Sequence, residues 1–345
     1  MRRSALYRIG PTVEPGRPDL PPTYGGGICV DSDFFAMMDV PFRSGGPWSR
    51  EDDANAAKVV VLRESKAKEL FGEQDPVGAT LRVNGADHVV TGVVSDRWEP
   101  MPKFYRAVSG PPPYAGVEDY FLPFTNAIAA EMDVQGTTSC TGRGREPGFE
   151  GLKQSECVWI MFWVELASAG DAAAYDDWLA GYAAEQQRIG RYERPDNHRL
   201  HDVRTWLDVN EVVPKDSRLQ TWLAFGFLLV CLVNTVGLLL AKSTARSGEI
   251  GVRRALGARR RTIFQQHLVE SGVAGAAGGL VGLALTLFFL HLLGKQAEEL
   301  EVLTRMDASM LLVTLATAVA ATLLAGLLPT WRACRVDPAL QVKSQ

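Results

Sequence analysis

RSGEIGVRRALGA, residues 246–258, is the stretch that decides how this chain is organised. It lies between two apolar segments that contain no Asp, Glu, Lys, Arg or His, the 23 residues 219–241 and the 20 residues 271–290. Each segment is long enough to cross a hydrocarbon core of about 30 Å as a helix. The quoted stretch is therefore predicted to be a loop at a membrane surface, between two spanning helices.

The loop is strongly basic, and this orients the rest of the chain. Residues 242–267 hold seven Lys or Arg and one acidic residue, Glu249. Short loops with such an excess stay on the cytoplasmic side of a membrane. Residues 1–217 are then expected outside, together with the acidic loop 291–307, and the C-terminus inside.

Local signals within the loop predict one short helix over residues 249–256. Ser247 is the expected N-cap, Glu249 suits the positive end of a helix, and Gly257 can end it. The helix invites two interpretations. It is either a handle that a soluble partner grips, or part of a solvated loop that only sets the orientation of the chain.

The side chains of this helix are expected to divide by face. Val252, Ala255 and Leu256 fall on one side at helical spacing. Arg253 and Arg254 are expected to turn outward, toward the partner in the first interpretation.

The same residues carry a family resemblance. EIGVRRALGA, followed by RRRTIFQQHLVES and a glycine-rich span, resembles the coupling loop of FtsX/MacB-type permeases, the membrane subunits of one class of ABC transporters. In that family the helix docks on the ATP-binding subunit. The resemblance implies that role here for Glu249, Ile250, Gly251, Arg253, Arg254, Leu256 and Gly257.

Further matches lie outside the loop. DSDFFAMMDVPFRSGGPWS, residues 31–49, and LFGEQDPVGATLRV, residues 70–83, resemble the external core domain of MacB-like permeases. WRACRVDPALQ, residues 331–341, resembles the family's C-terminal signature, including Asp337 and Pro338.

Charge divides the chain into two expected domains. Residues 1–217 hold 23 basic and 33 acidic residues, a net charge of −10, and residues 218–345 hold 13 and 7, a net charge of +6. We predict an α+β extracytoplasmic domain of the MacB-like periplasmic core type over 1–217. An all-α FtsX-like permease domain is predicted over 218–345. Its three spans are expected at about 219–241, 268–293 and 308–331.

The first half of the extracytoplasmic domain gives clear local predictions. KVVVL, residues 58–62, is typical of a strand, and residues 64–71 of a helix ended by Gly72. Residues 80–83 and 88–94 are predicted to form a hairpin, because Asn84-Gly85 suits a tight turn with positive φ.

The second half is predicted less regularly. Residues 105–157 are rich in Gly and Pro and are expected to form irregular loops or an inserted subdomain. Strands are predicted over 158–166 and 199–209, and a helix capped by Asp171 runs to about Gly190. One face of that helix is expected to pack in the core; it carries Tyr175, Trp178, Leu179 and Tyr182.

Small residues predict close packing of the second and third spans. They are Gly275, Gly278, Gly279, Gly282, Ala321 and Ala325. The apolar stretches 219–241, 271–290 and 308–331 contain no charged residue, which argues against an ion or proton pathway through the membrane.

Cysteines and histidines offer few site candidates. The extracytoplasmic domain has three cysteines, and an oxidising compartment would permit pairing, for which Cys140 and Cys157 are the best candidates. His198 and His201, three residues apart, could in principle bind a metal, but their segment favours a purely structural role. We therefore expect no metal.

No GxxxxGK[ST] phosphate loop occurs, so the chain is not expected to be an ATPase. Neither a GxSxG elbow nor an HExxH motif is present, so no other enzyme activity is expected. ATP is expected to be bound by a partner subunit, and no cofactor by this chain. Nucleic acid is not an expected partner, because the extracytoplasmic domain is acidic.

The start of the chain poses a conflict. The first twenty residues contain no apolar run that could act as a signal peptide or a span. Members of the family carry a membrane helix before the external domain. Met1 is therefore expected to be an internal start or the edge of a truncated fragment.

The leading hypothesis is a multi-pass permease of the inner (cytoplasmic) membrane with a large periplasmic domain. The resemblance implies a homodimer, or a heterodimer with a second permease, and an ABC ATP-binding subunit. A periplasmic adaptor and an outer-membrane channel would join it for efflux of antibiotics, peptides or other small molecules. The alternatives are an interaction protein that senses or regulates an external partner, and lipoprotein extraction. A membrane-anchored external enzyme is a third class, but it lacks a candidate site.

Overall fold

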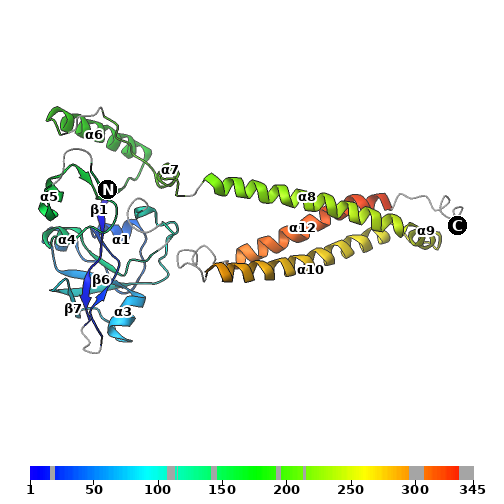
Figure 1. Cartoon of the computed structure of the whole chain (residues 1–345), viewed down its shortest axis with the longest axis horizontal. Coiled ribbons are helices and arrows are strands. Elements are labelled where there is room, and N and C mark those ends of the chain that lie inside the picture. Colours follow the sequence, from blue (N-terminus) through cyan, green and yellow to red (C-terminus); the bar gives the residue numbers. More distant parts are fainter. Residues whose placement is uncertain are drawn as a thin grey trace. The chain divides into compact units, whose positions relative to one another are not determined.

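The computed structural model describes residues 1–15, 20–106, 113–114, 116–140, 146–191, 196–212, 215–294 and 307–333. The chain divides into two compact units, Met1–Val213 and Pro214–Gln345. The first is a mixed α/β unit and the second is helical (Figure 1). The predicted fold class is thus confirmed.

The first unit is built on a ten-stranded sheet in the order β12-β1-β4-β9-β6-β8-β7-β2-β3, with β5 paired to β8. Its strands are β1 Arg2–Ile9, β2 Thr12–Glu14, β3 Thr23–Tyr24, β4 Gly27–Val30, β5 Phe42–Gly45, β6 Val59–Arg63, β7 Thr80–Val83, β8 Ala86–Val94, β9 Tyr120–Pro123 and β12 Met161–Glu165. A separate hairpin pairs β10 Ser139–Cys140 with β11 Cys157–Val158. The pairs β4/β9 and β6/β8 are parallel, and the other pairs of the large sheet are antiparallel.

The described part of the first unit also contains helices. They are α1 Asp33–Met37, α2 Arg50–Ala54, α3 Glu64–Phe71, the 3-10 helix η1 Phe104–Arg106, α4 Phe124–Ala129, α5 Gly148–Gln154, α6 Ala169–Arg188 and α7 Val203–Val209. Helices α3, α4 and α5 contribute to one buried cluster, and α1 and η1 to the other.

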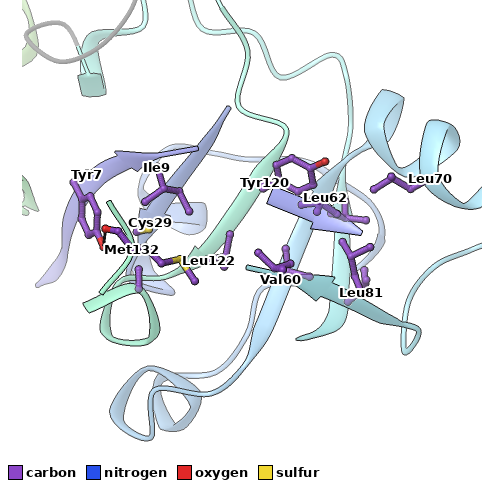
Figure 2. Close-up of a cluster of buried hydrophobic side chains, with 14 of the residues drawn as sticks. Tyr7, Ile9, Cys29, Val60, Leu62, Leu70, Leu81, Tyr120, Leu122 and Met132 are labelled. Atoms are coloured by element: carbon purple, nitrogen blue, oxygen red, sulfur yellow. Dashed lines mark hydrogen bonds between the residues drawn. The ribbon is translucent and has the colours of Figure 1, made fainter. Parts of the chain in front are cut away.

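The central strands are buried on both faces. In β9, Tyr120 and Leu122 enter the cluster shown in Figure 2, and Phe121 enters the opposite one. The same alternation occurs along β6 and β4. Successive side chains of a strand point to opposite faces, so a strand with an apolar layer on each side must be apolar throughout. This explains the uninterrupted runs VVVL and GICV.

A buried ion cluster lies beside the second apolar cluster. Glu118 accepts from Tyr105 Oη at 2.7 Å, while Arg106 Nε and Lys103 Nζ lie 2.5 Å and 3.5 Å from its carboxylate oxygens. Burial by itself would raise the pKa of Glu118, but Arg106 and Lys103 outweigh this effect and hold the pKa below its usual value. Glu118 is therefore a buried carboxylate that stays charged.

Several local predictions are confirmed. β6 and α3 lie where expected, and Gly72 ends α3 with φ 70°. The turn between β7 and β8 has φ 47° at Asn84 and φ 77° at Gly85, as a tight hairpin turn requires.

Three predictions in the second half of the unit are wrong. Residues 199–209 do not form a strand: Asp202 accepts from the Thr205 amide and caps α7. The described part of residues 105–157 is neither only irregular loop nor an insertion, because it contains the central strand β9 and the helices α4 and α5. The N-cap of α6 is Ser168, with Asp171 in the first turn.

The aromatic side chains of α6 are not core residues. No residue of α6 is buried, and the exposed fractions of Trp178 and Tyr182 are 58% and 44%. Their rings stack on each other at 5.8 Å, and Tyr175 lies 5.4 Å from Trp178. The prediction of burial is therefore wrong, because regular spacing on one face does not show whether another element covers that face.

The second unit contains four described helices, α8 Lys215–Ala245, α9 Ser247–Ala255, α10 Arg260–Gly294 and α12 Ala308–Ala333. Stretches of α8, α10 and α12 are long and apolar enough to cross a membrane: Leu219–Lys242, Arg260–Leu293 and Ala308–Leu327. Helix α12 contacts both α8 and α10 (Figure 1). All three helices are longer than the predicted spans.

Candidate functional site

Helix α9 lies between the spanning helices α8 and α10, at the position predicted for the coupling helix. It starts at Ser247, so Ser247 is the first helical residue and not the cap expected from the sequence. Its end is set at Gly257, which has φ 98°, a conformation that glycine adopts without strain. The Ala258 amide then bonds to the Arg253 carbonyl oxygen at 3.0 Å, which closes the last turn.

One side chain fastens α9 to the spanning helices. Ile250 is 7% exposed and forms a small buried cluster with Ile263 of α10, against which Ala258 and Phe264 also pack. Burying a side chain of this size stabilises a contact by about 1.5–3 kcal/mol. Ile250 therefore forms an apolar contact between α9 and α10.

The outward face of α9 is apolar. Val252 and Leu256, four residues apart, are 58% and 83% exposed. Arg253 does not simply point outward as predicted: it donates to Glu249 Oε1 at 2.6 Å and to Gln266 Oε1 at 3.4 Å. The side chains of Gly251, Arg254 and Ala255 are outside the description. The described surface thus offers a partner an apolar contact flanked by Arg253.

An ion cluster next to α9 was missed by sequence reasoning. Glu270 of α10 pairs with Lys242 of α8, lies 3.7 Å from Arg246 Nη1, and lies 3.6 Å from His267 Nδ1. The cluster joins the end of α8 to the start of α10. The sequence feature that could have indicated this cluster is Glu270, the first acidic residue after the basic loop 242–267.

The predicted packing glycines separate into two groups. Gly275 and Gly279 face α12: a Cβ on Gly275 would lie 1.9 Å from Thr322 Oγ1, and one on Gly279 would lie 3.2 Å from the Ala318 Cβ. A Cβ on Gly278 or Gly282 would meet no described atom within 4 Å. Of these four glycines, only Gly275 and Gly279 therefore lie in the contact between α10 and α12.

On α12, the corresponding face carries small residues as well. Gly326 lies against Ser271, whose Oγ would be 2.7 Å from an added Cβ. Ala325 is buried and Ala321 is half-buried. These positions let the two helix backbones approach closely.

Cys140 and Cys157 form a disulfide in the first unit. They are directly opposite each other in the β10/β11 hairpin, with Cα atoms 4.0 Å apart. Among the described cysteines, Cys29 and Cys231 are free.

The two histidines weighed as metal ligands serve separate roles. His198 Nδ1 lies 2.8 Å from Asp196 Oδ2, and its Nε2 lies 3.5 Å from Asp176 Oδ1. The His201 ring lies 6.4 Å from the Trp206 ring, with the two planes tilted by 37°. Within the described part of the chain no group of three or more His, Cys, Asp or Glu is placed to hold a metal ion. Asp337 and Pro338 of the C-terminal signature lie outside the described residues.

Comparison with family models assigns both units. The model described as MacB-like periplasmic core domain matches residues 4–180, and the model described as FtsX-like permease C-terminal matches residues 222–338. The second match contains α9, α10 and α12, and α8 from residue 222 onward.

Relatives of the whole chain agree with this assignment. The macrolide export ATP-binding/permease protein MacB of Azoarcus sp. (strain BH72) is 31% identical over 313 residues, which are 88% of this chain and 40% of that protein. The MacB protein of Syntrophobacter fumaroxidans is 23% identical over 90% of this chain and 46% of its own length. The chain thus spans less than half the length of these relatives.

Among solved structures, the periplasmic region of MacB from Actinobacillus actinomycetemcomitans superposes with a TM-score of 0.36 and 14% identity, covering 55% of this chain and 67% of that one. The two family models together match most of the chain, from residue 4 to 180 and from 222 to 338. The chain therefore belongs to the FtsX-like permeases that carry a MacB-like periplasmic core domain.

Proposed function

We propose that the chain is the permease component of a MacB-like ABC transporter, driven by a separate ATP-binding subunit that grips α9. The observation that carries this proposal is the two-sided character of α9. Ile250 ties it to α10, while Val252 and Leu256 remain exposed. A helix fixed on one side and apolar on the other is suited to transmit force from a partner.

The mechanism we propose is mechanical. Closure of the ATP-binding subunits displaces α9, and the contact of Ile250 with Ile263 passes that displacement to α10. The ion cluster around Glu270 holds the ends of α8 and α10 together, so both helices move with α9. The motion would reach the external unit through α8. ATP is bound by the partner in this scheme.

The cargo and assembly are proposed from the relatives. Those relatives are named as macrolide exporters, which supports efflux of antibiotics, peptides or other small molecules. We place the chain in the inner membrane, as a homodimer or as a heterodimer with a second permease. A periplasmic adaptor and an outer-membrane channel would complete the path.

Substitutions in α9 test the coupling role. Leu256→Asp places a carboxylate in the proposed contact with the ATP-binding subunit. The double change Arg253→Glu with Arg254→Glu reverses the charge that faces this subunit, and like charges across an interface can cost several kcal/mol. We expect both variants to lose co-purification of the ATP-binding subunit and the stimulated ATP hydrolysis. Leu256→Met keeps an apolar side chain and should behave as the unaltered chain.

Normal partner binding and normal stimulated hydrolysis in both altered chains would remove the main support for a transporter. The sensing or regulatory alternative would then be favoured. Because the double change also replaces two positive charges of the loop by negative ones, Arg259→Glu together with Arg261→Glu serves as the matched control for membrane insertion.

The orientation can be tested independently. The seven-to-one basic excess of residues 242–267 puts this loop inside. In a chain without other reactive cysteines, Arg254→Cys should resist a membrane-impermeant thiol reagent in intact cells, while Glu73→Cys on the external unit should react. Labelling of Arg254→Cys from outside contradicts this topology.

A further inference from the structure

Strand β12 is the edge of the large sheet, and its outer side presents unpaired backbone groups. The direction of these groups follows from β1. The Arg3 amide donates to Asp33 Oδ2 at 3.3 Å and the Ala5 amide to Asp31 Oδ2 at 2.8 Å, so both point away from β12. Opposite residues of an antiparallel pair point their backbone groups either both inward or both outward.

The register then identifies the outward residues of β12. Val164 lies opposite Arg3, and Phe162 lies opposite Ala5. The N–H and C=O groups of Phe162 and Val164 therefore point to the outer edge of the sheet. Among the described residues, no backbone hydrogen bond pairs this edge with another segment.

A groove of about 930 Å³ runs along this edge. One wall is formed by every residue from 158 to 164 and the other by residues 199–203. Consecutive residues of a strand point to opposite faces. A groove that touches all of them must follow the edge itself, where the outward N–H and C=O groups lie.

The side chains beside the groove are mainly apolar. Ile160 and Phe162 are 38% and 51% exposed. The opposite wall is held in place by α7, which Asp202 caps, and by Trp206, whose Nε1 donates to the Phe104 carbonyl oxygen at 3.2 Å. Arg199 stands exposed on that wall and supplies a positive charge.

We propose that this groove binds a short extended peptide segment of a partner polypeptide, which adds a strand to the sheet beside β12. An extended backbone supplies donors and acceptors that match those of Phe162 and Val164, which a lipid chain cannot do. Apolar side chains at alternate positions would cover Ile160 and Phe162, and an acidic side chain would pair with Arg199.

The size and walls of the groove favour this occupant over a folded domain. A stable protein interface buries about 1,200–2,000 Å², more than one edge strand offers. The wall of residues 199–203 also stands beside this edge and would obstruct the docking of a whole second sheet. The proposal does not depend on the coupling role of α9, so the two can fail separately.

The test uses the full chain in lipid nanodiscs and a defined peptide, acetyl-Thr-Val-Thr-Val-Asp-Val-Thr-amide. The matched control peptide has the same sequence with N-methyl groups on two consecutive central residues, which removes a donor from each edge. Binding is measured by fluorescence of a labelled peptide, and residue-resolved hydrogen exchange reports the amides of Phe162, Trp163 and Val164.

We expect the first peptide to bind saturably and to slow exchange at the Phe162 and Val164 amides, while the inward Trp163 amide, already paired with β1, stays unchanged. The methylated peptide should bind about tenfold more weakly, the loss expected for about one to two hydrogen bonds. Docking through side chains alone would not protect the outward amides.

Variants of β12 give the same test from the side of the protein. Val164→Pro removes an outward donor without touching the ladder to β1, a position where an edge strand tolerates proline. It should lower the affinity about tenfold, whereas Val164→Thr should not. Unchanged circular dichroism and unchanged protection of the Trp163 amide show that the sheet is intact.

Four results would overturn the proposal. One is equal binding of the two peptides, and another is binding that leaves the exchange of Phe162 and Val164 unaltered. The third is absence of binding at millimolar peptide. Protection of both amides in the peptide-free chain that disappears on dilution would also refute it, since a second copy would then cover the edge.

Discussion

In the first unit, strands β4, β6 and β9 send successive side chains into two buried clusters, whereas helices α8, α10 and α12 of the second unit leave most of their apolar side chains exposed. The buried share of the most apolar window is 0% in α8, 6% in α10 and 17% in α12. The apolar side chains of the sheet are buried by other parts of the protein, whereas those of the helices need lipid to cover them. The two units therefore depend on different contacts and should respond differently to substitution.

The largest effect is expected at the buried ion cluster of the first unit. Glu118→Gln leaves Arg106 and Lys103 buried without their counter-charge. Breaking a buried pair in this way destabilises by about 3–5 kcal/mol. The free energy of unfolding should be measured by denaturant titration at pH 7. Glu165→Gln, which breaks the half-exposed pair with Arg2, should cost at most about 1 kcal/mol.

The loss at Glu118 should also depend on pH. Because the folded pKa of Glu118 is lowered, its charge contributes stability above its unfolded pKa, and this contribution is lost as the pH falls through the folded pKa. The difference between the unaltered chain and Glu118→Gln should therefore shrink in acid. A difference that stays constant down to pH 2 would show that the charge of Glu118 does not stabilise this unit.

The next effect concerns the disulfide of the same unit. Replacing Cys140 and Cys157 by Ser opens a loop with a sequence separation of 17 and should lower the free energy of unfolding by about 3 kcal/mol. Thiol counting on denatured, unreduced protein from an oxidising compartment should find both cysteines unavailable. If both react as free thiols there, this pair does not stabilise the unit.

A smaller effect is expected in the second unit, where packing concerns only one face of each helix. Gly275→Leu must displace Thr322 and should destabilise the α10/α12 contact by about 1–3 kcal/mol. Gly278→Leu points to open space and should have little effect. Thermal unfolding in one detergent compares the two. Equal destabilisation by the two variants would mean that another helix covers Gly278. The two glycine faces of α10 would then both be packed in the assembled protein.

Local and periodic features were readable from the sequence because they depend on near neighbours. The spans follow from uninterrupted apolar runs, and the turn at Asn84-Gly85 follows from the φ angles that these residues adopt. The position of α9 follows from two spans and one basic loop. The disulfide pairing was proposed from the compartment implied by the topology, and the structure contains that bond.

Other features were decided only by tertiary structure. Residues 199–209 have the composition of a strand, but the Asp202 cap and the contact of Trp206 with Phe104 make the second part helical. Trp178 and Tyr182 have the spacing of a core face, yet no described element covers them. A residue pattern specifies which side chains share a face, but burial of that face requires a partner surface from elsewhere in the chain.

The need for a partner surface also explains why the two faces of α10, and the two faces of α9, differ in burial. Gly275 and Gly278 are equivalent in sequence, but only Gly275 meets Thr322. The sequence by itself predicted a short helix between two apolar spans, with its apolar residues at helical spacing, and α9 lies there. Tertiary structure decided that Ile250 faces inward and Leu256 outward, because only the fold brings Ile263 against one side of the helix and leaves the other side open.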